Sequence, residues 1–112
     1  MTYALFIDDE RDPPADGKLW RIARSLPELR AMLDRHGPPH HASFDHDLGE
    51  GMETGLDIAK FMVEQDLEYR AGERATPLPV GFSFYVHSQN PVGAENIRSY
   101  LGNYLAVRNG LA

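Results

Sequence analysis

Residues 3–9 read YALFIDD and residues 41–47 read HASFDHD, so two short stretches of the chain each end in acidic residues. A short apolar run closed by acids is typical of a buried strand that stops at the edge of a sheet. Residues 80–87, VGFSFYVH, alternate between apolar and small or polar residues, which predicts an exposed edge strand. Residues 20–24, WRIAR, complete the set as the second strand along the chain, and residues 80–87 are the fourth.

Helix signals separate these strands. Three further segments are predicted to be helices, because each follows a residue type that commonly caps a helix: Ser25, Thr54 or Asn90. The first two starts have the capping-box pattern, with Glu28 or Asp57 three residues further on. Residues 11–17 hold two prolines and cannot be helical, so no helix is expected between the first and second strands. Strands that alternate with helices pair in parallel, which predicts an open α/β sheet.

The composition sets limits on the function. The chain has 112 residues, the size of a single domain over residues 1–112. It has 11 basic and 17 acidic residues, a net charge of −6, which argues against coating nucleic acid by bulk charge. It has no cysteine, which excludes disulfides, thiolate nucleophiles and Cys-based zinc sites. No apolar run approaches the ~20 residues of a membrane span and the N-terminus does not resemble a signal peptide, so we expect a cytoplasmic protein.

Polar side chains gather at the carboxyl ends of the predicted strands. They are Asp8 and Asp9, then Asp45, His46 and Asp47, then His87 and Ser88. Ligands bind outside these strand ends in parallel sheets, so we expect the side chains to meet at one rim. Two carboxylates about 4 Å apart repel by about 4 kcal/mol at an effective dielectric constant of about 20. Such a cluster either keeps protons or holds a cation, and oxygen ligands favour Mg²⁺, Ca²⁺ or Mn²⁺. The alternative is that Asp8 and Asp9 are solvated strand-end acids.

The segment DLGEGMETGLD at residues 47–57 resembles the phosphoacceptor loop of response-regulator receiver domains. In receivers an aspartate after the third strand is followed eight residues later by a glycine that opens a helix, as with Asp47 and Gly55 (55 − 47 = 8). The resemblance places Asp47 in the phosphoacceptor position and Asp8 and Asp9 in the Mg²⁺-binding acid pair. It implies a truncated receiver-like (flavodoxin-like) three-layer α/β sandwich with a mainly parallel four-stranded sheet in the order 2-1-3-4. The fifth strand of a receiver, with its lysine, has no counterpart.

Four motifs together resemble the cyclic-phosphate-processing receiver-like family. They are LFIDDERDPP at residues 5–14, SFDHDLG at 43–49, TGLDIA at 54–59 and HSQNPVG at 87–93. This resemblance implies a metal-dependent phosphoesterase, a hydrolase that acts on a nucleotide or RNA end bearing a 2′,3′-cyclic phosphate. The implied cofactor is Mg²⁺, with Mn²⁺ as the alternative, and the implied process is RNA processing.

Opening a cyclic phosphate with water requires a metal, a base, an acid and donors for the phosphoryl oxygens. The residues assigned to the metal are Asp8, Asp9, Asp47 and Asp45. Those assigned to catalysis are His46, His87 and Asp47, because histidine titrates near neutral pH. Those assigned to the phosphate are Arg11, Ser88, Asn90 and Gly93, the last two at a helix start whose N–H groups suit an anion.

Structural roles are the alternatives at several of these positions. His46 orients a carboxylate, His87 makes a structural hydrogen bond, Asn90 only caps its helix, Arg11 pairs with local acids, or Asp45 braces its turn. The alternative function is a non-enzymatic receiver-like module that accepts or binds a phosphoryl group at Asp47 for signalling, or that docks a protein partner. Because the edge of the fourth strand lacks a neighbour, we also expect a homodimer through this strand or the last helix.

Overall fold

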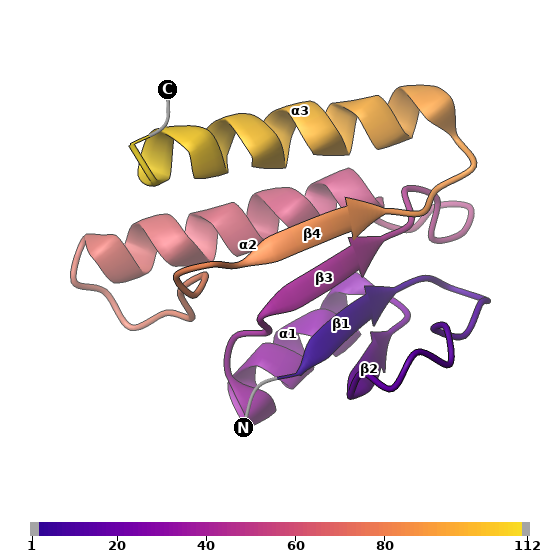
Figure 1. The fold of residues 1–112 in the computed structure, drawn as a ribbon, viewed down its shortest axis with the longest axis horizontal. Coiled ribbons are helices and arrows are strands. Elements are labelled where there is room, and N and C mark those ends of the chain that lie inside the picture. The colour runs from indigo at the N-terminus through magenta and orange to yellow at the C-terminus, as the bar shows by residue number, and fades with distance from the viewer. Residues whose placement is uncertain (1–2, 111–112) are drawn as a thin grey trace.

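Four parallel strands form one sheet in the order β2-β1-β3-β4 in this computed structural model, which describes residues 3–110 (Figure 1). The strands are β1 (Ala4–Ile7), β2 (Trp20–Ala23), β3 (His41–Phe44) and β4 (Ser83–Val86). β1 pairs with β2 and β3, and β3 pairs with β4. The register places Ile7 opposite Phe44 and Phe44 opposite Val86, so these three strands end at the same level. The predicted α/β class, receiver-like fold and strand order are confirmed.

Three helices follow the strands: α1 (Leu26–His36), α2 (Gly55–Arg70) and α3 (Pro91–Arg108). Each begins as predicted, with the side chain of Ser25, Thr54 or Asn90 accepting a backbone N–H in the first turn. Thr54 closes a complete capping box, whereas at the first helix Glu28 accepts the N–H of Arg24 and not that of the cap. Within residues 3–110, none of the helices combines the length and apolar character needed to cross a membrane.

β4 is shorter than the predicted strand of residues 80–87. Val80 is fully exposed and lies in a turn closed by a hydrogen bond from Phe82 N–H to the Pro79 carbonyl. Gly81 in this turn has φ 80°, a value that interrupts a strand. β4 is an edge strand as predicted, with exposed Tyr85 on one face. The homodimer through this edge stays a prediction.

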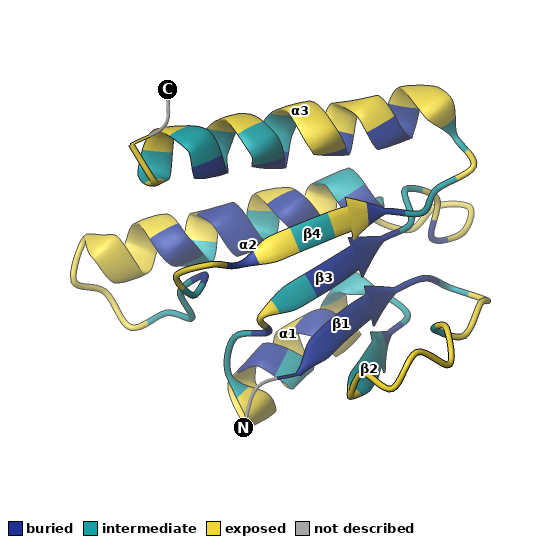
Figure 2. Ribbon diagram, viewed as in Figure 1, coloured by how far each residue is buried: buried dark blue, intermediate teal, exposed yellow. Residues whose placement is uncertain are grey.

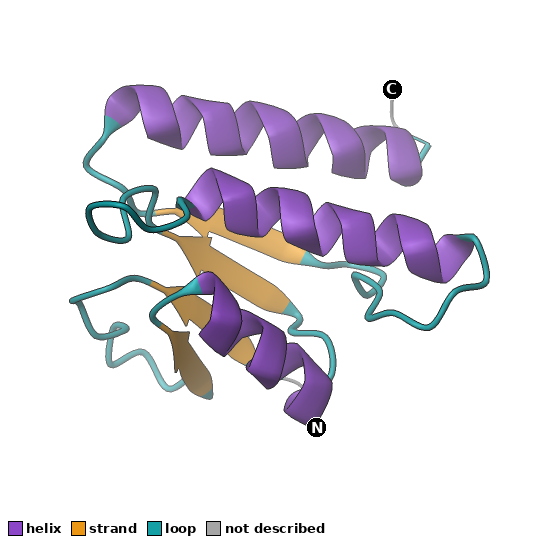
Figure 3. Ribbon diagram, turned by 180° about the vertical axis from the view of Figure 1, so that it is seen from behind, coloured by secondary structure: helices purple, strands orange, loops and turns teal. Residues whose placement is uncertain are grey.

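All three helices share one apolar core with one face of the sheet. This face carries Leu5, Ile7, Ala42, Phe44 and Val86, which join the buried stripes of the helices. Seen from behind, α1 and α2 lie in front of the strands (Figure 3). The opposite face bears no helix in the part of the chain that the structure describes, and Figure 1 looks onto it. The structure therefore has a helical layer on one face of the sheet and not on both, as the predicted three-layer sandwich would have. The reason is that the β1–β2 connection is the proline-containing loop and not a helix.

The sheet is buried most deeply at β1 and β3, its two central strands (Figure 2).

Asp66, a buried acid in the middle of α2, connects the loop that precedes β4 to two helices. Its carboxylate accepts the N–H of Leu78 at 2.9 Å and the hydroxyl of Tyr104, and lies 3.5 Å from Arg108. Arg108 also donates to the carbonyls of Leu78 and Pro79. This role of Asp66 was not predicted from the sequence.

Candidate functional site

Three carboxylates meet at the carboxyl ends of β1 and β3. The pairing of Ile7 with Phe44 continues in a hydrogen bond from Asp45 N–H to the Ile7 carbonyl at 2.8 Å, which brings Asp45 beside Asp8. One carboxylate oxygen from each of Asp8, Asp9 and Asp45 lies within 4.8 Å of the others. Like charges this close repel strongly, and the all-oxygen donor set suits a hard divalent cation. The residues present therefore fit the metal that the family resemblance implies.

Asp8 is the buried member of this group, with 1% of its surface exposed. Burial opposes its charged form, but three hydrogen bonds outweigh that effect and lower its pKa below the ordinary value. Two come from the backbone N–H groups of Glu10 and Arg11, each at 2.9 Å, and the third from His87. The loop after β1 thus folds around an ionised Asp8.

His87 connects the end of β4 to Asp8. Its Nε2 lies 2.9 Å from Asp8 Oδ2 and its Nδ1 lies 2.7 Å from Ser43 Oγ. An ionised carboxylate only accepts, so Nε2 carries a proton and donates it to Asp8, while Nδ1 shares a second hydrogen bond with the Ser43 hydroxyl. The ring also stacks on Phe6, with centroids 4.5 Å apart. Both nitrogens of His87 are engaged, which makes this side chain well suited to orient Asp8.

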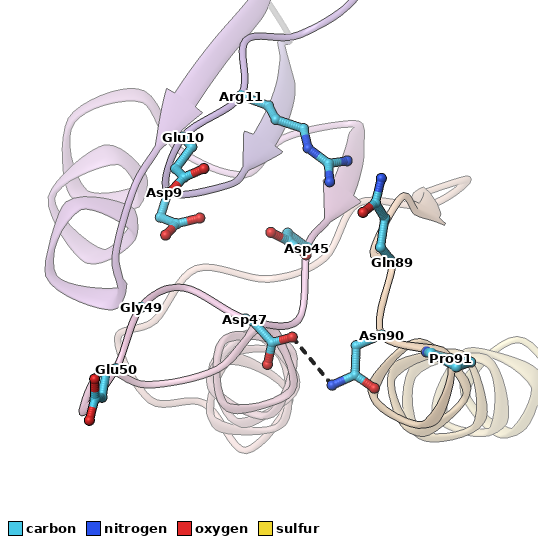
Figure 4. Close-up of a pocket in the computed structure, with 10 residues that line it drawn as sticks. All are labelled: Asp9, Glu10, Arg11, Asp45, Asp47, Gly49, Glu50, Gln89, Asn90 and Pro91. Atoms are coloured by element: carbon cyan, nitrogen blue, oxygen red, sulfur yellow. Dashed lines mark hydrogen bonds between the residues drawn. The ribbon is translucent and has the colours of Figure 1, made fainter.

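Asp47 lies apart from the three-carboxylate group. Its carboxylate is held by His46 Nδ1 at 3.0 Å. On its other side Asn90 Nδ2 donates to it at 3.3 Å (Figure 4). These two hydrogen bonds, that of His46 first, lower the pKa of Asp47 below its ordinary value. Its side chain is 66% exposed, so Asp47 presents a charged, accessible carboxylate beside the cluster.

The start of α3 is occupied by its own cap. Asn90 Oδ1 accepts the N–H of Gly93 at 2.9 Å, and Ser88 Oγ accepts the N–H of Asn90 at 3.1 Å. A Cβ on Gly93 would lie 2.3 Å from the His46 ring, so only glycine leaves room for this histidine. Asn90 therefore caps the helix as predicted and also holds Asp47, while Gly93 makes space for His46.

Several of these residues line an open pocket of about 740 Å³, which we call the acidic pocket (Figure 4). It is lined by Asp9, Glu10, Arg11, Asp45, Asp47, Gly49, Glu50, Gln89, Asn90 and Pro91. Five of these carry carboxylates, and Arg11 supplies the positive charge of the lining. The acids favour a bound cation, and the guanidinium offers donors to an anion held beside it. Of the residues assigned from sequence, Asp8, His46, His87, Ser88 and Gly93 are not part of this lining, but His46 contacts Asp47, and Ser88 and Gly93 contact Asn90.

A family model described as "Cyclic-phosphate processing Receiver domain" matches residues 3–103. The chain belongs to this family. The match spans all three segments that build the acidic pocket. Searches of curated proteins and of solved structures found no match. The family assignment made from sequence is confirmed, and the family's description ties this receiver domain to cyclic-phosphate processing.

The receiver domain also contains a supporting residue that the motifs did not reveal. Arg24, directly after β2, donates to the backbone carbonyls of Asp8 and Arg11 and pairs with Asp12 at 3.1 Å. It therefore fixes the loop that carries Asp9 and Arg11. Nothing in the sequence signals this role, because the contact joins residues 12 to 16 positions apart across a loop without regular structure.

Receiver spacing and strand register select different aspartates at the end of β3. The eight-residue spacing to Gly55 points to Asp47, whereas the register with β1 places Asp45 next to Asp8. The turn is tight here: Gly55 N–H donates to the His46 carbonyl at 2.7 Å, and a Cβ on Gly55 would collide with the Asp45 carbonyl. The metal role of Asp47 stays a prediction, while Asp45 occupies the position nearest the other two acids.

Proposed function

We propose that this receiver domain is a metal-dependent phosphoesterase that opens a cyclic phosphate, with the 2′,3′-cyclic phosphate end of RNA as its substrate class. The observation that carries the proposal is the group of Asp8, Asp9 and Asp45, of which Asp9 and Asp45 line the same pocket as Arg11. Water adds to phosphorus, the bond from phosphorus to one ribose oxygen breaks, and a phosphate monoester remains. The water loses a proton and the released ribose oxygen gains one.

The metal would be held by Asp8, Asp9 and Asp45, with Mg²⁺ or Mn²⁺ as the ion that suits this donor set. When bound, it would neutralise phosphoryl charge and lower the pKa of a coordinated water. Hydrogen bonds to Asp8 from two backbone amides and from His87 keep its carboxylate ionised and oriented.

The remaining steps use the residues around Asp47. Asp47 presents an exposed carboxylate beside the acids that would hold the metal, and it is the group that we assign to accept the proton of the attacking water. His46, 3.0 Å from Asp47, is the group that we assign to return a proton to the released ribose oxygen. Asn90 holds Asp47 from the other side, and Arg11 contributes donors to the phosphoryl oxygens. His87 acts in this proposal as a positioning residue, because both of its ring nitrogens are engaged.

The test is turnover of a nucleoside 2′,3′-cyclic phosphate by the full chain with Mg²⁺ or Mn²⁺, followed as the monoester by phosphorus NMR. Asp9→Asn is expected to abolish turnover. His46→Ala is expected to lower it by about 10²–10⁴-fold, the usual contribution of a general acid or base. Asp34→Asn, an exposed aspartate on α1, is the matched control and should retain full activity. Equal turnover by wild type and Asp9→Asn would overturn the proposal.

The exposure of Asp47 favours one competing function, in which this carboxylate accepts a phosphoryl group. In that reaction a carboxylate oxygen attacks the phosphorus of acetyl phosphate, and acetate leaves. Mass spectrometry would detect the added phosphoryl group, and Asp47→Asn would remove it. A stable acyl phosphate on Asp47 without turnover of any cyclic phosphate would replace the phosphoesterase proposal by a signalling role.

A further inference from the structure

A second hollow, of about 540 Å³, lies on the helix-free face of the sheet, outside the acidic pocket. We call it the aromatic hollow. Its lining includes five aromatic side chains and one serine: Phe6, Trp20, His41, Tyr85, His87 and Ser43. Its volume is within the 300–1,000 Å³ typical of small-molecule sites. This face is open because the β1–β2 connection is a loop, and so no helix of the described chain covers the hollow.

The rings are held in fixed positions. His87 lies parallel to Phe6, with 5° between their planes, and Trp20 packs edge-on against Phe6 with centroids 5.7 Å apart. Trp20 Nε1 donates to Asp16 at 2.8 Å, and His41 Nδ1 lies 2.7 Å from Ser83 Oγ. Tyr85, 63% exposed, stands on the edge strand at the other side of the hollow from Trp20. Ordered aromatic walls of this kind favour a flat, aromatic ligand.

The aromatic hollow and the acidic pocket are neighbours. Arg11 lines both of them, and His87, in the lining of the hollow, hydrogen-bonds to Asp8 of the carboxylate group. A single ligand that reaches both sites therefore needs a flat ring at one end and an anion at the other, joined across the Arg11 guanidinium. A nucleoside phosphate has this combination: a base, a ribose and a phosphate.

We infer that the aromatic hollow binds the base of the nucleotide whose phosphate enters the acidic pocket. The inference rests on the proposed function, and it specifies the substrate as a nucleoside phosphate recognised through its base. The charges at the rim agree with a small polar ligand, because Arg11, Lys18, Asp12 and Asp16 surround the rings. An apolar protein surface docking here would bury these charges at a cost.

Trp20 is the only tryptophan in the chain, so its fluorescence reports directly on the aromatic hollow. The full chain is titrated with AMP, which has no cyclic phosphate and therefore measures binding without turnover. AMP is expected to quench Trp20 saturably. Ribose 5-phosphate, which carries the phosphate without the base, is expected to bind at least ~10-fold more weakly and to leave the emission unchanged.

Tyr85→Ala is expected to weaken AMP binding by about 5- to 100-fold, the range that loss of one stacking partner produces. Tyr69→Ala, which removes another exposed tyrosine from α2, is the matched control. Tyr85→Phe retains the ring and should bind AMP as wild type does, which separates stacking from any effect on folding. A trinucleotide of adenosine with a 3′-phosphate distinguishes the source: tighter binding than AMP identifies an RNA end, and equal or weaker binding identifies a free nucleotide.

Equal affinity for AMP and ribose 5-phosphate, with no change in Trp20 emission, would overturn the inference. So would a dimer in which Trp20 is shielded from a soluble quencher, because a second copy would then occupy the hollow. The base site and the phosphoesterase activity fail separately. AMP binding without turnover of cyclic phosphates counts against the activity alone, and turnover that ignores the base counts against the site alone.

Discussion

His87 Nε2 lies 2.9 Å from Asp8 Oδ2, although the two residues are 79 positions apart and follow strands that do not pair with each other. β3 lies between β1 and β4, and its Ser43 hydroxyl holds the other nitrogen of the same ring. Three consecutive strands of the sheet thus cooperate to fix one carboxylate. This contact connects the aromatic hollow on the open face to the three-carboxylate group at the strand ends.

Replacing His87 should weaken metal binding without removing a metal ligand. Partners that orient a ligand typically contribute 10- to 100-fold in metal affinity or activity. We therefore expect His87→Ala to lower the affinity for Mn²⁺ by about that factor in calorimetry. His40→Ala, an exposed histidine on the loop before β3, is the control. Unchanged Mn²⁺ affinity in His87→Ala would show that Asp8 needs no such support.

Metal titrations should also separate the aspartates of the acidic pocket. Asp9→Asn and Asp45→Asn each remove a member of the three-carboxylate group, so each should abolish measurable binding of Mg²⁺ or Mn²⁺. Asp47→Asn should retain binding within a few-fold, because Asn90 and His46 hold its carboxylate outside that group. The opposite order, with Asp47→Asn losing binding and Asp45→Asn keeping it, would support the assignment made from receiver spacing.

The fold was predictable because its signals are local. The starts of three helices are indicated by their capping residues Ser25, Thr54 and Asn90, and the ends of three strands by acids or a histidine. The site was predictable only to the level of its rim, because which carboxylates converge depends on the register between β1 and β3. Asp45 and Asp47 both follow β3, and sequence spacing alone cannot show which of them lies beside Asp8.

Other features depend on contacts between distant parts of the chain. Arg24 acts on a loop without regular structure, and Asp66 lies buried in a helix stripe where an acid is unexpected. The sheet has helices on one face only because no helix lies between β1 and β2. Pro13 and Pro14 indicate that this connection is a loop, but they do not show which face of the sheet stays open. The aromatic hollow was missed for the same reason. Its rings look like ordinary core residues in the sequence and come together only when the face has no helix.

Two glycines of α3 provide a matched test of packing at the site. A Cβ on Gly93 would lie 2.3 Å from the His46 ring, so Gly93→Ala should destabilise the protein by about 1–3 kcal/mol and displace His46 from Asp47. A Cβ on Gly102 has nothing within 4 Å, so Gly102→Ala should stabilise the helix by up to about 1 kcal/mol. Urea unfolding measures both. Equal effects of the two substitutions would mean that His46 moves aside freely.

Alkaline pH should weaken the contacts between α2 and α3. Burial, together with the hydrogen bond to the Asp66 carboxylate, raises the pKa of Tyr104 from 10.0 to about 12. A pKa raised in the folded state gives stability that is fully present below pH 10 and is lost as the pH rises towards 12. Tyr104→Phe removes this hydrogen bond, so the variant should be less stable than wild type at pH 7 by about 1 kcal/mol. This difference in stability between wild type and Tyr104→Phe should then close as the pH rises from about 10 to 12, because only the wild type must keep this phenol protonated.

Urea unfolding at pH 7, 9 and 11 measures the gap, and Tyr69→Phe on the exposed side of α2 controls for the general loss of stability in alkali. A gap that stays constant across this range would show that the phenol of Tyr104 titrates alike in the folded and unfolded chains.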